Sequence, residues 1–371
     1  MADLARKLKE LRESRRLTLE QAAKLAGFRN FQTLSKIEHG SRQIKAEELV
    51  TLAKAYSFDI NFFLLDEPKP SEVQIFWRAE LKPSNPQIVE AKLQMYFDRY
   101  LHLQEILGYT KMGHRLFEIN QPIENAANAA EYGERYACDL KLGDRPGITL
   151  PTILEEEWNL PIFYFELPDG TSAGSIISKN NAAIAVNSLD APWRRKFDIA
   201  HEVFHIIHKQ SAPEECGASN DSAQETFANA FASALLLPRG PLEIELERRK
   251  KKGQIQITDL MILAREFGVS LDALIWRLVN FGRITRNKAQ TVLSSPAVRE
   301  YNKSVKRDER WETPHISRKY LSMVFEAVNQ GLMSKMRAAE YLDVSISKLE
   351  AVFLSAGLAL KEESDIEVTI M

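Results

Sequence analysis

The sequence predicts a multidomain protein with an all-α domain at the N-terminus, an α+β domain in the middle and a mainly α region at the C-terminus. The chain has 371 residues, which is too many for one ordinary hydrophobic core. Residues 1–66 contain short helical patterns in series, and residues 161–188 contain short apolar and β-branched runs that are typical of strands. We expect domains at 1–66 and 126–290, a linker with a bracing helix at 67–125, and a helical region at 291–371.

Composition narrows the class of protein. Apolar residues make up 44% of the chain and charged residues 27%, with a formal net charge of −2, which indicates a globular protein without a general attraction to nucleic acid. The two cysteines, Cys138 and Cys216, argue against a disulfide framework or a cysteine-rich zinc site. The sequence shows neither a signal-peptide core nor an apolar run long enough to span a membrane. The expected location is the cytoplasm, with no membrane partner.

The first domain is built from short helices joined by tight turns. Leu4, Leu8 and Leu11 recur at helical spacing. Thr18 is placed to cap a second helix, with Gln21 completing a capping box, and Asn30 is placed to cap a third. Small alanines on the second helix allow the third to cross it closely, which is the logic of a helix-turn-helix.

Charge in this segment points to a phosphate-binding surface. Residues 1–45 contain eleven Lys and Arg against five Asp and Glu, a local net of +6 in a chain of −2 overall. With "LSKIEHGSR" at 34–42, the segment resembles the Cro/lambda-repressor (XRE) family of helix-turn-helix proteins. This resemblance implies binding to double-stranded operator DNA, as a homodimer on a symmetric operator. It places these residues on the exposed start of the recognition helix: Arg29, Asn30, Gln32, Thr33 and Lys36. The alternative is a helical protein-interaction module with a solvated charged face.

The strongest chemical signal is "FDIAHEVFHIIHK" at 197–209, which follows the expected strands at 161–167, 173–178 and 182–188. His201 and His205 lie four residues apart on one helical face and can chelate one zinc ion. Glu202 is offset so that it can hold a zinc-bound water, whose lowered pKa lets this carboxylate act as the base. His208 lies a further three residues along the axis, too far to share that ion.

A third protein ligand is required if one position is to stay open for water. Glu225 heads a helical face of small residues in "ETFANAFASALLLP" and is the favoured ligand. Glu214, Glu215 and Asp221 compete with it, although their surroundings are typical of a loop.

Residues 126–282 resemble the ImmA/IrrE family of metallopeptidases. Four segments carry the resemblance: "WRRKFDIAHEVFHIIH", "ETFANAFASALLLP", "SAGSIISKNNAAIAVN" and "LAREFGVSLDALIWRL". It implies a zincin-like fold and a zinc endopeptidase that cleaves helix-turn-helix repressors, with His201, His205 and Glu225 as ligands and Glu202 as base. The family commonly has glycine before the second histidine, where this chain has Phe204. A ring at that position either narrows the cleft or tightens the core.

Two later segments, 256–282 and 334–357, each contain a helix, a turn and a helix. In the first, leucine, isoleucine and Trp276 occupy the position of a recognition helix, which indicates packing or a docking groove for substrate. The leading hypothesis for the chain is a DNA-binding regulator with a fused zinc endopeptidase. One alternative is a regulator whose peptidase-like domain is a non-catalytic sensor or antitoxin-like scaffold. In a third hypothesis the N-terminal module docks helix-turn-helix substrates instead of DNA.

Overall fold

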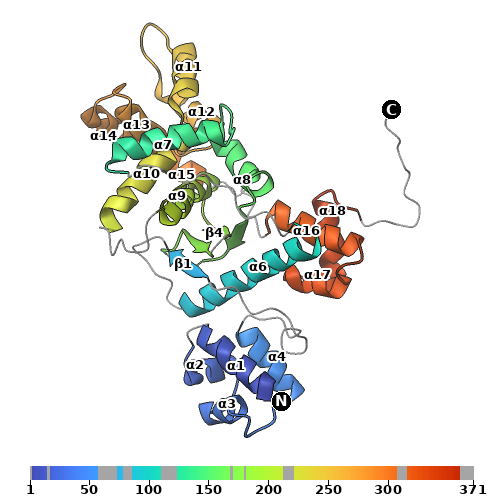
Figure 1. The fold of residues 1–371 in the computed structure, drawn as a ribbon. Coiled ribbons are helices and arrows are strands. Elements are labelled where there is room, and N and C mark those ends of the chain that lie inside the picture. The colour runs from blue at the N-terminus through green and yellow to red at the C-terminus, as the bar shows by residue number, and fades with distance from the viewer. Residues whose placement is uncertain are drawn as a thin grey trace, which may run out of the picture.

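The computed structural model describes residues 2–14, 17–56, 73–77, 86–109, 123–167, 170–178, 181–211, 221–306 and 316–359. Figure 1 shows a small helical unit at the N-terminus, a central sheet between two groups of helices, and a cluster of red helices from the end of the chain. No helix among these residues is long and apolar enough to cross a membrane. The predicted order, with a helical domain, an α+β domain and a mainly helical C-terminal region, is confirmed.

Within residues 2–14 and 17–56 the N-terminal unit contains four helices: α1 (Ala2–Ser14), α2 (Leu19–Leu25), α3 (Phe31–Glu38) and α4 (Ala46–Ala55). The predicted caps are present. Thr18 Oγ1 accepts the Gln21 N–H at 3.2 Å while the Gln21 side chain accepts the Thr18 N–H, and Asn30 Oδ1 accepts the Thr33 N–H at 3.1 Å. Ala22 and Ala23 are buried, so α2 and α3 pack closely, as expected for a helix-turn-helix.

The "IEHG" segment, residues 37–40, fixes the end of α3 through a buried ion pair as well as through its turn. Ile37 lies in the core of the unit, and Gly40 adopts a φ of +69° that ends the helical path. Glu38 is buried and accepts two hydrogen bonds from Arg12, from Nε at 2.8 Å and from Nη2 at 3.0 Å. Arg12 Nη1 also donates to the Leu17 carbonyl at 2.9 Å. Helix α1 is therefore tied to the end of α3 through a charge pair shielded from water.

The central sheet has four strands in the order β1-β3-β4-β2. Their bounds are β1 (Gln74–Trp77), β2 (Ile162–Phe165), β3 (Ala173–Ile177) and β4 (Ala182–Asn187). β1 and β4 both pair antiparallel with β3, whereas β2 pairs parallel with β4. The strands predicted around 161–188 are confirmed as β2 to β4. β1 was not predicted, and it adds a segment from the expected linker to the sheet.

Both faces of the sheet are covered by helices. One face packs against α7 (Ala126–Asp139), α8 (Pro146–Glu156), α9 (Pro192–Ser211), α10 (Asp221–Leu236), α12 (Ile257–Phe267) and α13 (Leu271–Asn280). The other packs against α6 (Pro86–Ile106), α16 (Arg318–Asn329), α17 (Lys335–Tyr341) and α18 (Leu349–Ser355), the last two joined by η1 (Ile346–Lys348). On β4, Ile184 and Val186 enter the first core while Ala183 and Ala185 enter the second. This alternation explains why the strand is apolar throughout.

The first core positions the site. α9 lies against β3 and β4 on one side and against α10 on the other, and α10 packs along α7. The close contact of α10 with α7 depends on Gly133, because a Cβ there would lie 2.3 Å from the Phe231 carbonyl oxygen. Three further helices complete this part of the chain: α11 (Arg239–Arg249), α14 (Arg286–Leu293) and α15 (Pro296–Lys306).

Candidate metal centre and nucleic-acid interface

Helix α9 buries its polar residues along with its apolar ones. Val203, Phe204, Ile206 and Ile207 are fully buried, because the helix is enclosed by the sheet and by α10. His201 and Glu202 are buried at the same depth, and His205 is nearly so. Burying two imidazoles and a carboxylate costs free energy unless they find partners or an ion.

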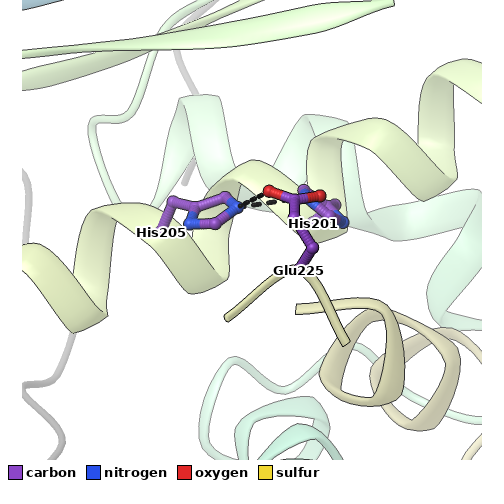
Figure 2. Close-up of side chains that lie close together, drawn as sticks. All are labelled: His201, His205 and Glu225. Carbon is purple, nitrogen blue, oxygen red and sulfur yellow. Dashed lines mark hydrogen bonds and ion pairs between the residues drawn. The ribbon is translucent and has the colours of Figure 1, made fainter. Parts of the chain in front are cut away.

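The structure brings the predicted ligands together. Figure 2 shows His201 and His205 projecting from α9 toward Glu225, which comes from the facing helix α10. His201 Nε2 lies 3.3 Å from Glu225 Oε2, and His205 Nε2 lies 3.2 Å from Glu225 Oε1. The two Nε2 atoms are 3.1 Å apart. One donor atom from each of the three residues falls within 4.8 Å of the others.

This donor set fits a zinc ion. Two imidazole nitrogens and one carboxylate oxygen form a known catalytic zinc set, which leaves one position open. Two Nε2 atoms at 3.1 Å cannot both offer lone pairs to each other without a proton or a cation between them. Burial raises the pKa of Glu225, but the hydrogen bonds that it accepts from His201 and His205 outweigh burial and hold that pKa well below its ordinary value. The carboxylate is therefore ionised and ready to bind a cation.

Asn229 orients one of the histidines. Its Oδ1 lies 3.2 Å from His201 Nδ1 and favours the tautomer with the proton on Nδ1, which would leave the Nε2 lone pair available to a zinc ion. Asn229 lies four residues after Glu225 on α10, so both side chains point toward α9. The sequence analysis placed Asn229 only on a face of small residues. Its spacing from Glu225 was the signal that could have identified it as a partner of His201.

Glu202 has an oxygen without a partner among the described residues. The residue is 1% exposed, and within the described parts of the chain its Oε1 has no hydrogen-bond partner. A buried carboxylate oxygen without a donor costs free energy, so such an atom calls for an explanation. A water molecule or a substrate group at the neighbouring metal centre would supply the missing donor.

Phe204 lies in the core and not in the cleft. Its ring is fully buried and packs against Phe231 of α10 with the ring centroids 5.6 Å apart. It also contacts the His205 ring edge-on at 5.7 Å and stacks on His208 at 5.5 Å. Of the two consequences expected for this residue, the structure supports the tightened core. His208 stands beside Phe204 and is not part of the His201, His205 and Glu225 cluster.

The competing ligands fall in two groups. Glu214 and Glu215 lie outside the described residues. Asp221 begins α10, and among the described residues the group that could hold a metal ion comprises only His201, His205 and Glu225.

The predicted DNA contacts lie around the start of α3. Arg29, Asn30, Gln32 and Lys36 are exposed, and Thr33 is half-buried. Two of these residues are engaged with each other, because Asn30 Oδ1 accepts hydrogen bonds from the Thr33 N–H and from Thr33 Oγ1. Gln32 and Lys36 keep free side chains on the outer face. The sequence analysis did not single out Phe31, the first residue of α3, whose ring is 41% exposed on this surface.

Comparison with known proteins identifies two domains. Residues 3–61 match the family model for a helix-turn-helix domain, and residues 155–279 match the model for an IrrE N-terminal-like domain. The match at 155–279 includes α9 and α10, with all the residues of the candidate metal centre.

The other comparisons add little. No curated protein matches the sequence. A solved structure of a Mycobacterium tuberculosis transcriptional regulator shares 18% identity with 48% of this chain and has a TM-score of 0.31, too low to support an argument. This chain aligns with 52% of that regulator, about half its length. The two family matches show that this chain joins an N-terminal helix-turn-helix domain to an IrrE N-terminal-like domain.

Proposed function

We propose that this protein is a DNA-binding transcriptional regulator whose second domain is a zinc-dependent endopeptidase acting on a repressor-like protein. The observation that carries the peptidase proposal is the convergence of His201, His205 and Glu225, with donor atoms within 4.8 Å of one another, next to the unpaired carboxylate oxygen of Glu202. The helix-turn-helix domain, with its exposed basic and amide side chains on α3, supports the DNA-binding part. A role on DNA agrees with the cytoplasmic location that we propose for the protein.

Each residue has a distinct task in the proposed reaction. His201, His205 and Glu225 hold the zinc ion, and Asn229 keeps the His201 ring in the ligating tautomer. When bound, the ion acts as a Lewis acid that activates a water molecule and polarises the scissile carbonyl. Glu202 accepts a proton from the attacking water and returns it to the leaving nitrogen as the C–N bond breaks. The buried setting of Glu202 excludes bulk water from this proton transfer.

The first test of the peptidase proposal is the metal content of the purified protein. We expect about one zinc per chain, as for a three-ligand catalytic site, and a much lower content in Glu225→Ala. Absence of zinc from both proteins after reconstitution would refute the metal centre.

Activity needs a separate test, because a metal-binding sensor would pass the first. Unmodified protein and Glu202→Gln are incubated with candidate repressors, and the cleavage products are identified by mass spectrometry. Cleavage by the unmodified protein alone supports a peptidase. A zinc-loaded protein that cleaves nothing would instead be a non-catalytic sensor or scaffold.

DNA binding is tested by gel shift with fragments of the promoter region upstream of its own gene. We expect affinity to fall steeply with salt concentration, because Lys and Arg displace counterions from the phosphates. Binding in pairs to a symmetric site would support a homodimer. Absence of any shift at low salt would favour the hypothesis that the module docks proteins.

A further inference from the structure

A large cleft runs along the N-terminal half of α9, and two of its lining residues, Phe197 and Asn229, neighbour His201. Its volume is about 1730 Å³, above the range of roughly 300–1,000 Å³ that suits a drug-sized ligand. α9, α10, α13 and α15 contribute walls. Asn229, which contacts His201, lines the cleft, as does Phe197, whose ring lies 6.4 Å from that of His201. A cleft of this size, with walls that include neighbours of His201, suits an extended peptide segment.

The cleft contains positive charge that the described residues do not neutralise. Lys196 of α9 is half-buried, and Arg265 comes from the end of α12. Within the described parts of the chain, neither side chain forms a hydrogen bond or an ion pair with an acidic residue. Burial and the nearby charge of Arg195 lower the pKa of Lys196, as expected for an ammonium group without an anion beside it.

The other charged groups of the cleft are already engaged, and among them Asp190 interacts electrostatically with Arg195. Arg194 donates to Asp198 at 3.1 Å and to Ser172 Oγ at 3.1 Å. Asp272 accepts a hydrogen bond from Asn302 Nδ2 at 3.1 Å. Lys196 and Arg265 thus remain as the cations available to an occupant of the cleft.

The turn between α12 and α13 brings Lys196 to the surface of the cleft. Gly268 has a φ of +68°, and a Cβ at that position would lie 2.8 Å from Lys196 Nζ. The glycine therefore leaves room for the ammonium group beside the backbone. Trp276, in the middle of α13, adds an apolar side chain to the wall of the same cleft. The docking groove considered for this helix pair in the sequence analysis thus has a physical counterpart.

We propose that this cleft binds the substrate segment on the His201 side of the scissile bond, and that Lys196, assisted by Arg265, selects an acidic side chain in that segment. The proposal rests on the peptidase function proposed above and specifies its substrate class. An Asp or Glu side chain would give Lys196 the anion that it lacks and form a charge-assisted hydrogen bond. Phe197 and Trp276 would contact apolar neighbours of that residue.

The test measures binding instead of turnover. Full-length protein carrying Glu202→Gln is immobilised and exposed to a mixture of short synthetic peptides with randomised positions, and the retained peptides are sequenced by mass spectrometry. We expect Asp and Glu to be enriched at one position on the order of tenfold, the value of a charge-assisted hydrogen bond. Adding Lys196→Gln should bring their frequency back to that of the input.

Matched variants separate the role of Lys196 from general effects of charge and folding. Lys288→Gln removes an exposed lysine of α14 outside the cleft and should leave the enrichment unchanged. Arg265→Gln changes an exposed side chain that is not needed for packing, so it gives a readout even if Lys196→Gln fails to fold. It should reduce the enrichment in part.

Three results would overturn the inference: no acidic enrichment in the parent protein, an enrichment that survives Lys196→Gln and Arg265→Gln, or saturable binding of inorganic phosphate without acidic enrichment. The last would assign the cleft to a small anion. Failure of the proposed function has a different signature, because the peptide mixture would then be retained with acidic enrichment but never cleaved by the unmodified protein.

Discussion

Replacing Asn229 with alanine tests whether the hydrogen bond to His201 prepares this ring to bind zinc. Asn229 Oδ1 lies 3.2 Å from His201 Nδ1, within hydrogen-bond distance of that nitrogen. Without that acceptor the proton can move to Nε2, the atom that faces Glu225 at 3.3 Å. A protonated Nε2 cannot bind a metal ion.

The expected loss of zinc affinity can be estimated from the known effect of removing a hydrogen-bond acceptor that orients a ligating histidine. Removing the acceptor that orients a ligating histidine costs about 10- to 100-fold in metal affinity. That range corresponds to about 1.4–2.7 kcal/mol. Because the Asn229 side chain is exposed to the cleft, the substitution creates no buried cavity, and we expect little loss of folding stability.

The assay is a competition titration for zinc against a chromophoric chelator. Asn229→Asp serves as the conservative variant, because a carboxylate accepts the same hydrogen bond and should retain or raise the affinity. Ser233→Ala is the control for altering the same helix one turn further along the cleft, and it should have no effect. If Asn229→Ala bound zinc within about twofold of the unmodified protein, the argument that Asn229 sets the tautomer of His201 would be wrong.

Three further predictions follow from buried groups. Glu38→Gln removes the buried counter-charge of Arg12 and leaves only the longer, exposed contact with Glu13, so it should destabilise the helix-turn-helix domain by about 3–5 kcal/mol. Glu48→Gln, at a partly exposed pair, should cost less than about 1 kcal/mol, and amide hydrogen exchange of α1 to α4 compares the two variants. Phe204→Ala should cost about 3–5 kcal/mol in denaturant unfolding, and a loss below about 1 kcal/mol would contradict its place in the core. Burial raises the pKa of Glu155 to about 7 from 4.5, so the folded protein holds a proton that the unfolded chain releases, and stability falls as pH rises between these values. Glu155→Gln should remove up to about 3 kcal/mol of that pH-dependent loss of stability. Thermal melts of both proteins across this pH range measure the effect, and melting temperatures that change with pH in parallel would refute the reasoning.

Local rules allowed the caps, and the shared helical face of His201 and His205, to be predicted from the sequence. Thr18 and Gln21 satisfy backbone groups within one helical turn, and His201 and His205 share a face because of the helical repeat. Such relations need only residues close in sequence. Glu225 was favoured for the same reason, since its helical face is small enough to approach α9.

Contacts between distant segments could not be predicted in the same way. The strand β1 exists because Gln74 to Trp77 pair with β3, about a hundred residues later in the chain. Gly174 makes room for it, because a Cβ there would lie 2.6 Å from the Trp77 ring. The pairing of Arg12 with Glu38 and the bond of Asn229 to His201 likewise depend on how helices meet in three dimensions.

The position of Phe204 determines whether substrate access or the chemistry of Glu202 decides if this domain is an active peptidase. Had the ring filled the cleft, activity would depend on access of the substrate. Because the ring packs against Phe231 in the core, its departure from the family pattern leaves the cleft unobstructed. The question then rests on Glu202, whose Oε1 is buried without a partner. A domain that only held a metal ion would gain stability from an apolar or amide residue at this position, since an unpaired buried carboxylate is costly. If Glu202 transfers a proton as proposed, Glu202→Gln should abolish cleavage and leave metal binding intact, so this variant separates a peptidase from a metal-binding scaffold.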